Sequence, residues 1–162
     1  MNPDLAGGSL LDIGIYPLSI TQFILQAEPE KIQAQAVLSR TGVDVYTAAS
    51  LHYSSGVVAQ FSANAMANTV DDLVITGMEG TITVSENFYM ADKAILEVNG
   101  QRKRKFRGKL HCGGFEYQIE EAMACIRAGK IESDIMSHAD SLGNMRVMDK
   151  IRAQIGVKYP FE

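Results

Sequence analysis

Between Lys31 and Arg107 the chain alternates apolar and polar residues with a period of two, and short turn sequences interrupt the alternation. Ser54-Ser55-Gly56, Gly77–Gly80 and Asn99-Gly100 each separate two apolar runs, and such sequences are typical of β-hairpins. Hairpins join neighbouring strands in antiparallel order, and the sequence shows no strand–helix–strand unit. This block therefore predicts one antiparallel sheet of about six or seven strands. The expected strands cover residues 32–39, 46–53, 57–65, 73–76, 81–84, 94–98 and 102–106.

A segment with helical character precedes this block. It runs from about Ser9 to Gln26, and apolar residues cover most of its circumference, which predicts a largely buried helix. Pro17 removes one backbone donor, so the helix is expected to bend or restart near Tyr16.

Two further helices follow the sheet. Residues 115–128 and about 137–154 place apolar side chains at three- and four-residue spacing, and Gly129 and Gly156 stand where these helices should end. The whole pattern predicts an α+β fold: an open, mostly antiparallel sheet with helices on one face. Short, mixed residues on the other face would then meet solvent or a second subunit.

Composition narrows the class of protein. A chain of 162 residues, 46% hydrophobic and 21% charged, fits one globular domain, and a net charge of −4 argues against general nucleic-acid binding. No apolar run approaches the 18 residues of a membrane span, and residues 1–6 lack the features of a secretory signal. Cys112 and Cys125 do not form a CxxC pair and suit free thiols in a reducing compartment. We expect a cytoplasmic protein without a membrane partner.

The first helix carries two protic side chains, Asp12 and Tyr16, four residues apart in otherwise apolar sequence. Residues at this spacing lie on one face of a helix, and glycines Gly8 and Gly14 flank the pair. A carboxylate beside a phenol indicates a candidate acid/base site. The alternative is structural: an aspartate that starts the helix, beside a tyrosine whose hydroxyl reaches the surface. Composition alone favours this alternative.

Other candidate features have simpler interpretations. The basic run 102–107 is typical of a solvated edge hairpin, where Lys and Arg oppose edge-to-edge pairing. His52, His111 and His138 are far apart and lack metal-ligand spacing, so no metal site is expected. A nucleophilic pair of Cys112 with His111 is disfavoured, because adjacent residues rarely point at each other.

The string Gly7–Tyr16, GGSLLDIGIY, closely resembles the start of the C-terminal domain in the Gfo/Idh/MocA family of NAD(P)-dependent oxidoreductases, in its tyrosine branch. Residues 75–82 resemble the mid-sheet hairpin of that family. Residues 115–122 and 140–152 resemble its two closing helices. The resemblance covers nearly the whole chain, in order.

The resemblance implies a single substrate-binding and dimerisation domain over residues 1–162, whose subunits pair through the open sheet face as a homo-oligomer. The catalytic loop and helix would occupy residues 1–28, the antiparallel sheet 31–107 and the two closing helices 115–156. The family's Rossmann domain, with its Gly-rich turn and Glu-Lys-Pro motif, precedes this domain, and neither motif is in the sequence. No cofactor-binding residue is therefore expected in this chain.

The resemblance also implies a chemistry. An enzyme of this kind transfers a hydride between NAD or NADP and a hydroxyl of a sugar, polyol or dihydrodiol. Tyr16 matches the acid/base position, and Asp12 would orient a substrate hydroxyl or the lysine of the absent motif. Gly14 and Gly8 would lie close to substrate or cofactor. The chain alone is expected to be inactive. A non-enzymatic dimerisation or ligand-binding module remains the alternative, and a thiol redox enzyme using Cys112 ranks below it.

Overall fold

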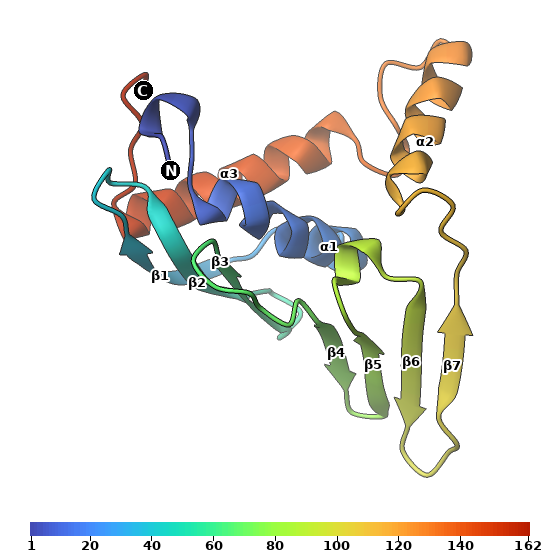
Figure 1. Cartoon of the computed structure of the whole chain (residues 1–162). Coiled ribbons are helices and arrows are strands. Elements are labelled where there is room, and N and C mark those ends of the chain that lie inside the picture. Colours follow the sequence, from blue (N-terminus) through green and yellow to red (C-terminus); the bar gives the residue numbers. More distant parts are fainter. The chain divides into compact units, whose positions relative to one another are not determined.

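The structure is a computed structural model that describes residues 1–162 (Figure 1). The chain forms two compact units. One unit comprises residues 1–68 and 134–162, and the other comprises residues 69–133. The helices are α1 (Ile15–Leu25), α2 (Phe115–Arg127) and α3 (His138–Ile155), with a π-helical turn at Leu10–Gly14 and short 3-10 turns at Pro3–Leu5 and Phe88–Met90. The strands are β1 (Lys31–Leu38), β2 (Asp44–His52), β3 (Val58–Asn64), β4 (Leu73–Gly77), β5 (Gly80–Val84), β6 (Lys93–Val98) and β7 (Arg104–Arg107).

The first unit is a three-stranded antiparallel sheet in the order β1-β2-β3, and α1 and α3 cover one of its faces (Figure 1). Along β2 every second residue, from Val45 to Leu51, is buried, while those between are half-exposed. This is the two-faced alternation that the sequence predicts. The buried core joins the first helical segment, β2 and α3 through Leu10, Leu18, Ala49, Leu51, Tyr53, Val147, Met148 and Ile151.

The first helical segment changes its hydrogen bonding where Pro17 requires it. A π-helical turn ends at Gly14, and α1 starts at Ile15, which confirms the restart predicted near Tyr16. Pro17 is the third residue of α1, so its missing donor falls in the first turn of that helix, where proline is tolerated.

The last helix begins and ends at the residues that the sequence indicates. Ser137 caps α3 by accepting a hydrogen bond from Asp140 N, and the Asp140 carboxylate accepts one from Ser137 N in return. Gly156 ends the helix with φ of +76°, and Gly129, just beyond α2, has φ of +68°. These left-handed conformations favour glycine.

The second unit is a four-stranded antiparallel sheet in the order β4-β5-β6-β7, followed by α2. Strand β7 lies at the edge, and all residues of the basic run 102–107 are exposed. Lys103 pairs with Glu97, and the Arg104 guanidinium lies 5.2 Å from the centre of the Phe106 ring. The interpretation of this run as a solvated edge is confirmed.

The predicted α+β class, with seven antiparallel strands, is confirmed, but the strands form two hydrogen-bonded sheets where one was expected. Residues 65–72, between β3 and β4, contain no strand. This segment lacks a period-two alternation, and the positive φ of Asp71 (+48°) is incompatible with an extended strand. The interruption falls where the two units separate along the chain.

The expectation that no apolar run reaches membrane-spanning length needs correction. Residues Pro3–Leu25 form a 23-residue helical stretch that includes an 18-residue window of mean hydropathy 1.3, enough by length and composition alone to cross a membrane. The core helix of a globular protein passes the same test. Leu10 and Leu18 of this stretch belong to the buried core with residues of β2 and α3.

A single carboxylate organises the loop before α2. Oε1 of Glu116 accepts hydrogen bonds from the N–H groups of His111 (2.6 Å) and Cys112 (3.0 Å), and Oε2 accepts one from Gly114 N–H (2.8 Å). These bonds, with that from Cys112 contributing most, lower the pKa of Glu116 to about 2 from its usual 4.5.

Because the folded-state pKa of Glu116 is depressed, the loop is stabilised above pH 4.5, and this contribution is lost as the pH falls toward about 2. We expect the amide proton shifts of His111, Cys112 and Gly114 to move together over this range in NMR spectra. Glu116→Gln should abolish the transition, and Glu120→Gln, on the exposed surface of the same helix, should retain it. An identical pH profile in Glu116→Gln would contradict the assignment.

Candidate active site

The two protic groups predicted from the sequence lie on the exposed side of the first helical segment. Asp12 belongs to the π-helical turn and is exposed, and Tyr16 lies in the first turn of α1 with 40% of its surface exposed. Leu10, Gly14 and Leu18, on the other side of the same segment, are buried. One side of the segment is therefore fixed in the core, while the other exposes a carboxylate and a phenol at the surface.

Gly14 lets this segment pack closely on β3. A Cβ atom at Gly14 would lie 3.0 Å from Leu10 Cδ1, 3.5 Å from Phe61 Cε2 and 3.7 Å from Ala63 Cβ. Contacts of 3.0 Å leave no room for a side chain without movement of the neighbour. The structure gives Gly14 a packing role, and its proximity to substrate or cofactor stays a prediction.

Gly8 is required by both its conformation and its neighbour. Its φ is +151°, and a Cβ atom there would lie 2.3 Å from Oδ1 of Asp44. The chain thus passes directly over a carboxylate just before the helical segment begins. A closer relation of Gly8 to substrate or cofactor, implied by the resemblance, stays a prediction.

Asp44 is the residue that the sequence interpretation missed. It is only 1% exposed, and its Oδ2 atom accepts three hydrogen bonds of 2.7 Å, from Ser9 Oγ, Leu10 N and Thr47 Oγ1. The sequence signal was a lone carboxylate between two valines, but the strand was expected to start at Tyr46, which left Asp44 outside it. As the first residue of β2, Asp44 instead joins the sheet to the start of the helical segment.

The C-terminal segment supports the same glycine-rich stretch from another side. The Tyr159 hydroxyl donates a hydrogen bond to the Gly7 carbonyl oxygen (3.3 Å). The guanidinium of Arg152 lies 4.5 Å from the centre of the Tyr159 ring and pairs with Asp149 and Glu162. Burial raises the pKa of Tyr159, so its hydroxyl stays protonated as a donor.

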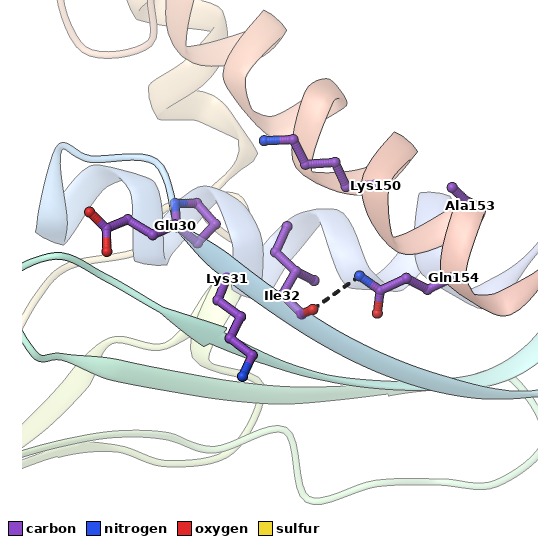
Figure 2. A pocket seen from close by; sticks show the side chains of 7 residues that line it. Glu30, Lys31, Ile32, Lys150, Ala153 and Gln154 are labelled. Atoms are coloured by element: carbon purple, nitrogen blue, oxygen red, sulfur yellow. Dashed lines mark hydrogen bonds between the residues drawn. The ribbon is translucent and has the colours of Figure 1, made fainter.

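A surface groove of about 450 Å³ lies between the start of β1 and α3 (Figure 2). It is lined by Pro29, Glu30, Lys31, Ile32, Lys150, Ala153 and Gln154. Gln154 donates to the Ile32 carbonyl oxygen (3.0 Å) and accepts from Ala34 N (2.9 Å), as a neighbouring strand would. Its amide thereby satisfies part of the free edge of β1. Neither Asp12 nor Tyr16 lines this groove.

No group of three or more His, Cys, Asp or Glu side chains is placed to hold a metal ion. Cys112 is exposed, and neither it nor Cys125 forms a disulfide. The N–H groups of His111 and Cys112 donate to Glu116, so the ordering of this loop has a structural explanation.

The structure therefore defines an antiparallel α+β protein that presents an accessible carboxylate and phenol at the start of its first long helix. The family model of the GFO/IDH/MocA C-terminal domain matches residues 1–83. This chain belongs to the Gfo/Idh/MocA family, which confirms the resemblance seen in Gly7–Tyr16.

Relatives with assigned names match almost the entire chain. A trans-1,2-dihydrobenzene-1,2-diol dehydrogenase of Danio rerio is 36% identical over 163 residues, which cover 96% of this chain and 48% of the relative. A D-xylose 1-dehydrogenase (NADP(+)) of Hypocrea jecorina is 30% identical over 184 residues, which cover 99% of this chain and 46% of the relative. The chain thus spans about half the length of the curated relatives it matches.

Solved structures share the fold at lower sequence identity. An aldose-aldose oxidoreductase from Caulobacter crescentus aligns with a TM-score of 0.76 at 22% identity and covers 91% of this chain and 45% of its own. A 3-ketoreductase from Actinomadura kijaniata, in complex with NADP and TDP-benzene, aligns with a TM-score of 0.74 at 23% identity, covering 92% and 46%. These matches support the fold.

Gly8→Ala should destabilise the chain by about 2–4 kcal/mol, because it adds a steric clash with Asp44 to an unfavourable φ. Gly42→Ala is the matched control: its φ is also positive (+82°), but nothing lies within 4 Å of the added atom. The control should lose only about 1 kcal/mol. Urea unfolding measures both losses, and equal losses would show that the Gly8–Asp44 contact does not constrain the fold.

Proposed function

We propose that this chain is the substrate-binding and dimerisation part of an oxidoreductase that transfers a hydride between NAD or NADP and a hydroxyl of a sugar, polyol or dihydrodiol. The names of the relatives, a dihydrodiol dehydrogenase and a D-xylose dehydrogenase, support this class of substrate. The observation that carries the proposal is the exposed pair Asp12 and Tyr16 on a helical segment whose opposite side is fixed in the core.

Tyr16 is the proposed acid/base. A nicotinamide cofactor would supply the hydride acceptor for oxidation of a carbinol, and Tyr16 would take the hydroxyl proton. A phenol has a pKa near 10, whereas a base that works at neutral pH needs a pKa near 7. Lowering the pKa by this amount requires roughly 4 kcal/mol of preferential stabilisation of the phenolate. A nearby cation supplies such a shift by favouring the phenolate. The lysine of the family's Glu-Lys-Pro motif, which is not in this sequence, is the expected cation.

Asp12 is the proposed orienting group. Its carboxylate is exposed on the same side of the segment as Tyr16, and an ionised carboxylate accepts hydrogen bonds from hydroxyl groups or from a lysine ammonium. Held by Asp12, a vicinal diol or sugar would present one hydroxyl to Tyr16 and donate with the other. Positioning of this kind lowers the entropic part of the barrier.

The outer face of α1 supports contact with a further domain. Ile20 lies four residues after Tyr16, and Phe23 and Ile24 lie three and four residues after Ile20. Phe23 and Ile24 are 55% and 42% exposed. Apolar stripes of this kind mark interaction surfaces. Since the chain spans about half of its relatives, we assign this stripe to a nucleotide-binding domain.

The open face of the first sheet is the proposed dimer interface. Antiparallel pairing aligns Gln33, Ser50 and Gln60 in one row across the three strands, and Gln35, Ala48 and Ser62 in the next. These side chains are uncharged and are exposed or half-exposed. An uncharged face of amide and small side chains suits a second copy of the same sheet. Cys112 and Cys125 form no disulfide, which supports the proposed cytoplasmic location.

Tyr16→Phe in the complete oxidoreductase should lower kcat by a factor of about 10²–10⁴, because it removes only the proton-transfer group. The affinity for NAD or NADP should not change. Tyr117→Phe is the control, since its hydroxyl bonds the Lys109 carbonyl oxygen in the second unit. Steady-state kinetics with a dihydrodiol and with D-xylose, together with cofactor titration, measure these quantities. Near-normal turnover in Tyr16→Phe would overturn the assignment.

The chain alone should be a dimer that binds neither NADH nor NADPH. Ser50→Arg should shift the mass from dimer to the 17.7 kDa monomer, because it places a charge at the centre of the open face. Gln118→Arg, on exposed α2, should remain dimeric.

Size-exclusion chromatography with light scattering measures the mass of the chain, and a titration with NADH and NADPH measures nucleotide binding. A dimer resistant to Ser50→Arg would refute this interface, and saturable nucleotide binding would place the cofactor site within this chain. A dimer that also lacks any activity when joined to its nucleotide-binding domain would favour the non-enzymatic alternative.

A further inference from the structure

We infer that Asp44 is a positioning residue, which fixes the helical segment that carries Asp12 and Tyr16 in the orientation that catalysis requires. The inference rests on the proposed function of those two residues. It assigns Asp44 no contact with substrate or cofactor. Its effect would pass through the backbone of the helical segment.

The contacts of Asp44 join two parts of the chain that are distant in sequence. Leu10 N and Ser9 Oγ, at the start of the helical segment, both donate to Oδ2, which Thr47 Oγ1 also contacts from within β2. All four residues are essentially inaccessible to solvent. Hydrogen bonds to a buried charged acceptor are stronger than neutral ones and leave unsatisfied donors when the acceptor is removed.

Asp44 supplies the hydrogen-bond acceptor that a local capping residue would otherwise supply. Ser9 precedes the π-helical turn, as a capping residue does, but its side chain makes no capping bond within the segment. Its hydroxyl instead donates to Asp44, and the same carboxylate accepts from Leu10 N at the first residue of the turn. A carboxylate at this end of a helix is also favoured by the helix dipole.

The anchored turn determines how the protic groups are presented. Tyr16 lies six residues after Leu10, about 9 Å along a helix axis. Asp12 lies within the π-helical turn and Tyr16 just beyond it, so the angle between them depends on the turn keeping its wider winding. Gly8 permits the carboxylate to sit directly under the chain. Loss of the anchor would free the turn while the core contacts of Leu18 hold the rest of α1.

Asp44→Ala and Asp44→Asn in the complete oxidoreductase separate anchoring from general stability. Alanine removes the acceptor, whereas asparagine keeps an oxygen that the three donors can share. In Asp44→Ala we expect hydrogen exchange of the Leu10 and Leu11 amides to rise about tenfold or more relative to Ile151 in α3. We also expect kcat to fall about 100-fold with unchanged cofactor affinity. Asp44→Asn should restore most of both.

Val147→Ala is the control, because it removes buried contacts from the same core without touching the carboxylate. It should raise exchange broadly and leave kcat near that of the unmodified enzyme. If Asp44→Ala does not fold, Ser9→Ala, which removes one donor and keeps the carboxylate, should still raise exchange selectively at Leu10 and Leu11.

Selective exchange together with the loss of kcat supports the inference. Exchange that rises uniformly, or a normal kcat in folded Asp44→Ala, overturns it. Normal turnover in Tyr16→Phe would instead refute the proposed function, while the exchange pattern would still show whether Asp44 anchors the segment.

Discussion

The buried carboxylate of Asp44 is the interaction on which the arrangement of this protein depends. Its three hydrogen bonds join the first residue of β2 to the start of the helical segment 34 residues earlier in the chain. A charge removed from water is costly without hydrogen bonds, and all three bonds go to Oδ2, while the buried Oδ1 atom accepts none. The site therefore requires the side-chain hydroxyls of Ser9 and Thr47 and a backbone N–H at Leu10. Gly8 belongs to the same constraint, because any side chain there would meet the carboxylate.

This anchor allows one short segment to pack into the core on one side and to expose a carboxylate and a phenol on the other. Leu10, Gly14 and Leu18 face inward and take part in close packing, whereas Asp12 and Tyr16 remain accessible. A helix held only by its apolar side could rotate or fray at its first turn, since the first backbone N–H groups lack intrahelical acceptors. The carboxylate from β2 and the Tyr159 hydroxyl bonded to Gly7 hold that end where a local capping bond is missing.

Local signals in the sequence predicted most elements, since their causes are local. Asn99-Gly100 marks a hairpin, Ser137 and Gly156 bound α3, and Pro17 predicts the restart near Tyr16. The role of Asp44 depends on contacts across 34 residues, which periodicity does not report. The division into two sheets depends on residues 65–72, where the hydrophobic alternation stops. No strong turn sequence marks this break, so the sequence did not predict it. The predicted site residues came from a family motif, and their exposure from the structure.

If Tyr16 is the acid/base, as proposed, its exposure leaves the activating cation and the exclusion of solvent to a second domain. A close positive charge favours a phenolate, and solvent between the two weakens this effect by screening. A phenol that acts as a base therefore requires both a close cation and removal of solvent around it. A domain that docks on the apolar stripe from Tyr16 to Ile24 would supply both in one step. The same contact would exclude water from the space between the substrate carbon and the nicotinamide. Docking of the two domains would then lower the pKa of the acid/base and exclude solvent from the reaction at the same time.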